Sequence, residues 1–144
     1  MTFKKNGDTY VIKLEKGEPV FKTLSTWCEK EKVTNAHFSG IGAVKDLSCG
    51  YYALGEKKYY FTKYPNLVEV VSMTGNVALK DGVPFLHVHG VFTDTENKAF
   101  GGHIEEMTVG VTLEIVLHSL NSDIARKPDE SIGLSLLELP CSFT

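Results

Sequence analysis

The sequence has few cysteines and gives them no pairing pattern. Cys28, Cys49 and Cys141 are the three in this chain of 144 residues. Their number is odd, and their wide spacing matches neither a disulfide framework nor a cysteine-ligated zinc site. We therefore expect reduced thiols and a cytoplasmic location, because disulfides persist mainly in oxidising compartments.

Positive charge is not in excess either. Lys and Arg number 15 against 18 Asp and Glu, which gives a formal net charge of −3. Affinity for DNA depends largely on cationic side chains that neutralise phosphates, so this balance argues against nucleic-acid binding. The best basic candidates are three short pairs that we expect to be solvated surface: Lys4-Lys5, Lys57-Lys58 and Arg126-Lys127.

Long apolar runs are also missing. No apolar stretch of signal-peptide length follows the N-terminal segment, and no run approaches the roughly 20 residues of a membrane span. The chain is 42% hydrophobic and 23% charged, as is typical of a globular domain. We therefore expect one domain over residues 1–144 and no membrane partner.

Helical periodicity is confined to one long segment near the N-terminus. Val20, Leu24 and Trp27 recur at helical spacing, and Pro19 suits the first helical position. From residue 35 onward the pattern is extended, with Gly or Pro between several runs. The expected strands cover residues 9–14, 36–39, 43–54, 58–64, 67–79, 85–93, 100–107, 111–120 and 133–139. This order predicts an α+β fold, a largely antiparallel β-sheet with one principal helix.

The most informative feature that is present is a group of histidines. Three of the five fall within seventeen residues. His87 and His89 alternate with apolar residues along an expected strand, so both lie on one of its faces. A polar, turn-prone segment at 94–98 predicts a hairpin in which Thr93 pairs with Ala99.

Continuing this register places His89 opposite His103 and His87 opposite Glu105, with all four side chains on one face. Directly opposed positions have Cβ atoms about 5 Å apart, so the imidazoles of His89 and His103 can reach one ion. A bulge at Gly101-Gly102 would instead turn His103 to the other face and leave three surface histidines. We favour a shared metal site, because the third histidine falls in matching register.

Three neutral histidines are a suitable ligand set for zinc, and they leave a fourth position for water, a substrate or a carboxylate. Zinc held in this way lowers the pKa of bound water to about 7. A metal-dependent hydrolase or lyase is therefore one interpretation, with Glu105 and Glu114 as candidate catalytic carboxylates. Glu114 lies in an apolar strand where a carboxylate needs a partner, and we favour a structural role for it.

Several motifs occur in an order that resembles one known family. They are Ser39-Gly40-Ile41-Gly42-Ala43, Gly50-Tyr51-Tyr52, Glu69-Val70-Val71-Ser72-Met73-Thr74-Gly75-Asn76, Phe85-Leu86-His87-Val88-His89, Gly101-Gly102-His103 and Thr112-Leu113-Glu114-Ile115. Together they are similar to the plant and prokaryote conserved (PPC) domain in its stand-alone prokaryotic form, over about residues 9–139. The resemblance implies an α+β domain that assembles as a homotrimer. It also implies that His87, His89 and His103 match the metal-holding histidines of prokaryotic members.

Family members are often described as candidate DNA-binding proteins, because plant relatives join this domain to AT-hook segments. This chain has no Arg-Gly-Arg-Pro segment, and residues 66–71 replace the plant pattern Gly-Arg-Phe-Glu-Ile-Leu. A DNA-binding function is therefore an analogy with the family. A cupin-like metal barrel is a further alternative, but no glutamate follows His89 within a few residues and no Pro-x-Gly precedes the last histidine.

Three hypotheses follow from these observations. The first is a cytosolic trimeric module whose metal site captures a small ligand or stabilises the assembly, with a regulatory role as one option. The second is a metal-dependent enzyme. The third is nucleic-acid binding by the trimer, which the acidic balance disfavours unless assembly gathers the few basic residues on one surface.

Overall fold

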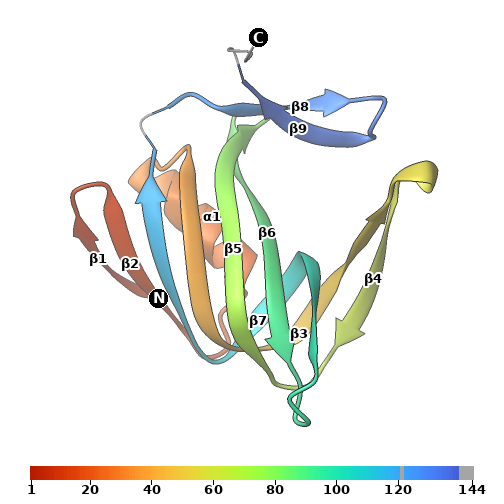
Figure 1. Ribbon diagram of the computed structural model, residues 1–144. Coiled ribbons are helices and arrows are strands. Elements are labelled where there is room, and N and C mark those ends of the chain that lie inside the picture. The colour runs from red at the N-terminus through yellow and green to blue at the C-terminus, as the bar shows by residue number, and fades with distance from the viewer. Residues whose placement is uncertain (121, 140–144) are drawn as a thin grey trace.

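The computed structural model describes residues 1–120 and 122–139, so Cys141 lies outside the described residues. Within them the elements are β1 Thr2–Asn6, β2 Thr9–Glu15, α1 Val20–Glu31, β3 Ala36–Ala53, a 3-10 turn η1 Leu54–Glu56, β4 Lys58–Tyr64, β5 Val68–Lys80, β6 Val83–Thr93, β7 Ala99–Ser119, β8 Ala125–Asp129 and β9 Leu134–Glu138 (Figure 1). The α+β fold predicted from the sequence is confirmed. No helix in the described part of the chain is long and apolar enough to cross a membrane.

The sheet closes on itself over part of its length. Its strand order is β1-β2-β7-β3-β5-β8-β9, and β6 pairs with both β5 and β7. Because β3 also pairs with β5 and β7, the four strands β3, β5, β6 and β7 form a closed ring. The second half of β3 pairs with β4 and, as far as Gly50, also with β7, and β3 and β4 form an arm that projects from the sheet (Figure 1).

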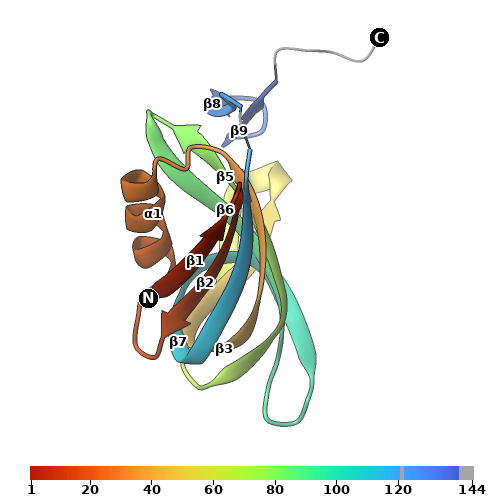
Figure 2. The ribbon, with the colours of Figure 1, turned by 90° about the vertical axis from the view of Figure 1, so that its left-hand side faces the viewer.

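The hydrophobic core lies between α1 and the sheet. The helix covers one face (Figure 2) and buries Val20, Leu24 and Trp27 against it. The ring of Trp27 meets that of Tyr10 edge-on, with centroids 4.9 Å apart. Pro19 adopts an extended conformation as the N-cap, so the helix begins one residue later than predicted. The opposite face of the sheet has no helix against it in the described part of the chain (Figure 2).

Two pairs of predicted strands are continuous in the structure. Residues 36–39 and 43–54 belong to β3 apart from Leu54, which begins η1, and residues 100–107 and 111–120 belong almost entirely to β7. The glycines that we expected to end strands lie instead within long strands, at places where the pairing is irregular. The register between β3 and β5, for example, shifts between Gly40 and Gly42. A Cβ at Gly42 would lie 2.1 Å from a backbone oxygen of β7, so glycine permits the close approach of the two strands there.

A C-terminal hairpin completes the structure. Strand β8 pairs in parallel with β5 and antiparallel with β9. The Tyr52 hydroxyl donates a hydrogen bond to the Ile132 carbonyl at 2.6 Å, and the Lys57 ammonium donates one to the Glu130 carbonyl at 2.6 Å. These bonds join the turn of the hairpin to the β3–β4 arm. The hairpin therefore spans from the end of β5 to the tip of the arm (Figure 1).

Candidate metal centre

Three histidines meet where β6 and β7 pair. His89 lies directly opposite His103, and five consecutive residue pairs join this position to the hairpin turn without a shift. His87 precedes His89 by two residues on the same face of β6, whereas Leu86 and Val88 on the other face are buried in the core. The hairpin register predicted from the sequence is confirmed from the Thr93–Ala99 pair to the His89–His103 pair.

The glycine pair before His103 serves close strand packing and does not form a bulge. A Cβ at Gly101 would lie 2.2 Å from the Gly90 carbonyl oxygen, and one at Gly102 would lie 2.4 Å from that of Gly50. Any side chain at these positions would force the strands apart. The glycines thus let β7 pass close to both β6 and β3 while His103 keeps the register of its partner.

The spacing of the three rings suits a shared ion. One ligand nitrogen from each lies within 4.8 Å of the other two. The Nε2 atoms of His87 and His89 are 3.2 Å apart. Two nitrogens bound to a tetrahedral zinc at about 2.0–2.1 Å stand about 3.3 Å from each other. The fold therefore holds the His87 and His89 nitrogens at about the separation that a metal needs, and it holds a His103 nitrogen within 4.8 Å of both.

Partial burial favours the neutral form of the His87 and His103 imidazoles. It lowers the pKa of His87 to about 4, and the charges of Arg126, His103 and His89 act in the same direction. The pKa of His103 is also lowered by burial and by His89, against an opposing effect of the Glu105 carboxylate. A neutral imidazole offers a lone pair with no proton to displace, so the site is prepared for a cation at neutral pH.

Aromatic residues of β4 pack against His103. The ring of Tyr59 stacks on the imidazole with centroids 4.6 Å apart and planes inclined by 29°. The Nδ1 atom of His103 is buried and has no hydrogen-bond partner among the described residues. A buried polar atom left without a partner costs free energy unless something else binds it. This orphaned nitrogen fits a site that takes a ligand.

Glu105 does not join the cluster. The predicted pair with His87 does not form, because β7 leaves β6 after His103 and pairs with β3. The Glu105 carboxylate instead accepts a hydrogen bond of 2.6 Å from the hydroxyl of Ser48, a buried residue of β3. It is near enough to raise the pKa of His103, but it is not among the groups within ligand distance.

Glu114 lies elsewhere on the sheet. It is exposed and sits opposite Lys13 of β2 and Ile41 of β3, while its neighbours Leu113 and Ile115 face the core. The expectation that this carboxylate needs a buried partner was wrong, because strand alternation turns it to solvent. Three strand spacings separate it from β6, about 14 Å, which is too far to bind the same ion.

Arg126 is the residue that sequence reasoning missed. It was expected on solvated surface with Lys127, but only 8% of it is exposed. Its guanidinium donates hydrogen bonds to Asn76 Oδ1 at 2.7 Å and to the Ser135 carbonyl at 3.1 Å. Asn76 lies directly opposite His87 on the neighbouring strand. The guanidinium therefore lies beside the histidine cluster. The contact between Arg126 and Asn76 joins residues 50 positions apart, and no local sequence motif predicts it.

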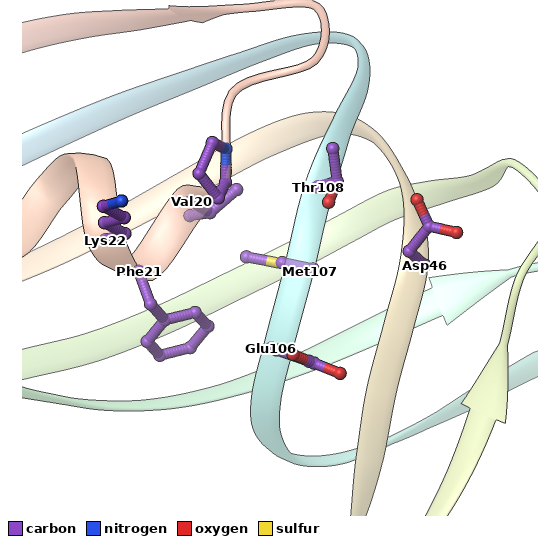
Figure 3. Close-up of a pocket in the computed structure, with 8 residues that line it drawn as sticks. Val20, Phe21, Lys22, Asp46, Glu106, Met107 and Thr108 are labelled. Atoms are coloured by element: carbon purple, nitrogen blue, oxygen red, sulfur yellow. The ribbon is translucent and has the colours of Figure 1, made fainter.

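A separate pocket of about 280 Å³ lies between the start of α1 and strands β3 and β7. Figure 3 shows Asp46, Glu106 and Thr108 on one side of it and Lys22 on the other. The charged groups do not converge on one point as the histidines do. This pocket contains none of the three histidines, and we assign it no function.

Comparison with known proteins identifies the family. The Plants and Prokaryotes Conserved (PCC) domain, which is the PPC domain under its other abbreviation, matches residues 1–121. This chain belongs to the PPC family. A solved PPC protein of Pyrococcus horikoshii is 33% identical to it, covers 98% of this chain and 97% of its own, and has a TM-score of 0.87. A search of curated proteins gives no match.

Two other solved structures resemble this PPC chain over nearly its whole length. A protein of Ralstonia eutropha JMP134, described as a "putative DNA-binding protein", is 32% identical, with 96% of each chain covered and a TM-score of 0.87. A protein of Archaeoglobus fulgidus, described as metal-containing, is 29% identical, with 96% of this chain and 99% of that chain covered and a TM-score of 0.84. Proteins similar to this chain are thus described in both ways.

Proposed function

We propose that this PPC protein binds a divalent metal, zinc best, through His87, His89 and His103, and acts as a small-ligand or regulatory binding module. The observation that carries the proposal is that one nitrogen of each ring lies within 4.8 Å of the other two. The lowered pKa of His87 and the orphaned Nδ1 of His103 support it. The metal-containing relative from Archaeoglobus fulgidus adds support from the family.

The surroundings of the cluster favour ligand exchange over a purely structural metal. Three histidines leave one zinc position open, and Glu105 is held away from it by Ser48. A pocket of about 300 Å³ adjoins His89 and is lined also by Thr74 and Gly102. A small molecule has room to approach the open position from this side.

The proposed assembly is a homotrimer, as the family resemblance implies. Its support on this chain is the face of the sheet away from α1, which exposes several apolar side chains by 40% or more: Val11, Ile41, Val71 and Val116. Exposed apolar patches of this kind are typical of association surfaces. The face is continuous with the histidine site, because Val11, Val116, Ser39, Thr74 and His89 are successive cross-strand neighbours.

A metal-dependent hydrolase or lyase is the alternative. The Glu105 carboxylate favours it, since it is near enough to influence His103 and would be the proton acceptor in such an enzyme. A DNA-binding role has the names of relatives in its favour, such as that of the Ralstonia protein. The burial of Arg126 removes one of the three basic pairs available to it. We also propose a cytoplasmic location, because Cys28 and Cys49 are free thiols.

Metal analysis of protein purified without a histidine tag tests the proposal. We expect about one zinc, or another divalent ion, per chain, and a loss of bound metal in His89→Ala and in His103→Ala. His118→Ala is the matched control, because His118 is an exposed histidine of β7 outside the cluster. A wild-type protein without affinity for zinc, iron, nickel or manganese would show that the proposal is wrong.

A further inference from the structure

Arg126 is a buried cation whose hydrogen bonding is incomplete. A guanidinium has five N–H donors, and that of Arg126 makes two hydrogen bonds, to Asn76 and Ser135. Its Nε is buried without a partner among the described residues. Three of its N–H groups therefore make no hydrogen bond to the described residues.

The charge of Arg126 also has no counter-ion among the residues that the structure describes. No carboxylate in the described part of the chain lies within 4.0 Å of the guanidinium, although six other ion pairs occur there. Its two hydrogen-bond acceptors, the Asn76 amide and the Ser135 carbonyl, are neutral, and so is the ring of Phe85, 5.5 Å from the guanidinium carbon. A buried charge without an opposite charge is costly, so this cation favours an incoming anion.

The position of Arg126 relates it to the histidines. Phe85 lies two residues before His87 on the same face of β6, and Asn76 lies directly opposite His87 on β5. Both neighbours of the guanidinium are thus neighbours of His87 as well. The β8–β9 hairpin that carries Arg126 is tied at its turn to the β3–β4 arm, whose Tyr59 stacks on His103. Arg126 also lies beyond the residues that the family model matches, 1–121.

We propose that the site takes a small organic dicarboxylate, with one carboxylate at the open metal position and the other on the guanidinium of Arg126. This inference rests on the proposed metal site. Zinc accepts carboxylate oxygens readily, and the planar fork of arginine matches the two oxygens of a carboxylate. A divalent ion beside a buried guanidinium makes the site strongly positive, so a neutral molecule of the same shape binds less well.

A purely structural role for Arg126 is the competing explanation, because its two hydrogen bonds also fasten the β8–β9 hairpin to the sheet. The two roles differ in what they affect. If the role is structural, substituting Arg126 lowers the stability of the hairpin, and the affinity for an anion does not depend on the charge at this position. A recognition role changes anion affinity in a protein that still holds its metal.

Calorimetric titration of malonate into the zinc-loaded protein tests the inference. Arg126→Met should weaken malonate binding by about tenfold or more, because it removes a charge-assisted pair. Arg126→Lys, which keeps the charge without the fork, should fall between wild type and Arg126→Met. Lys127→Met is the matched control. It removes a positive charge from the same hairpin at an exposed ion pair with Glu138, and we expect an unchanged malonate affinity.

Zinc content, measured first, separates the two proposals. If wild type and Arg126→Met both carry zinc and bind malonate equally, the dicarboxylate inference is wrong and the metal site stands. The same holds if zinc-loaded wild type does not bind malonate. If Arg126→Met loses its zinc, Arg126 is structural and the inference is again wrong. If wild type itself binds no zinc, both proposals fail.

Discussion

Metal-free protein should lose stability as the pH falls from 7 to 5, because folded His87 resists protonation. Its pKa is lowered from 6.5 to about 4, chiefly by burial. Well above pH 6.5 the imidazole is neutral in both the folded and the unfolded state. Between these two pKa values the unfolded chain takes up a proton that the folded chain does not, so the free energy of unfolding decreases as the pH falls. Below about pH 4 both states are protonated and this contribution stops changing.

The magnitude follows from the two pKa values. A full shift of this size corresponds to a loss of about 1.8 kcal/mol between pH 7 and pH 5. His87 is only half-buried, and solvent screening reduces the effect to about 1 kcal/mol. With a urea dependence of about 2 kcal/mol per molar, the unfolding midpoint should fall by about 0.5 M from this group alone.

Urea unfolding in EDTA at pH 7 and pH 5 measures this change, with every sample at one protein concentration because association shifts apparent stability. His87→Gln cannot take up the proton, so its midpoint should change about 0.5 M less than that of wild type. His118→Gln, at an exposed position outside the cluster, is the matched control and should behave as wild type. Equal midpoint changes in wild type and His87→Gln would refute the reasoning.

Two further predictions concern packing and thiol chemistry. Gly102→Ala should destabilise the protein by about 1–3 kcal/mol in thermal or urea unfolding, because its Cβ would lie 2.4 Å from the Gly50 carbonyl oxygen. Gly55→Ala, whose Cβ would meet open space, is the control, and equal stability of the two variants would contradict the prediction. Burial raises the pKa of the Cys28 thiol to about 12, so Cys28 should not react with a thiol reagent until the protein unfolds, and rapid labelling of native Cys28 would contradict this.

Strand alternation was enough to predict the histidine cluster. His87 and His89 share a face because they are two residues apart, and the turn at 94–98 fixed the register that brings His103 opposite His89. The α+β class followed in the same way from one helical segment among extended ones. These features depend on neighbours in sequence, which is the information that periodicity contains.

The features that the sequence did not reveal depend on distant contacts. Strands β1 and β8 are short and polar, TFKKN and ARKPD, so they show no alternation and exist through pairing with β2, β5 and β9. Arg126 is buried because β8 crosses the end of β5, and its contact with Asn76 joins residues 50 positions apart. The predicted position of Glu105 opposite His87 was wrong because β7 stops pairing with β6 after His103 and pairs with β3. The sequence contains no signal for this change of partner strand.

X-ray absorption at the zinc K-edge of the zinc-loaded protein tests the central claim most directly. We expect three imidazole nitrogens at about 2.0–2.1 Å and one exchangeable oxygen ligand. In His103→Ala that pattern should lose one imidazole or lose the zinc altogether. A wild-type spectrum with oxygen ligands alone, or one that His103→Ala leaves unchanged, would contradict the assignment of the metal to His87, His89 and His103.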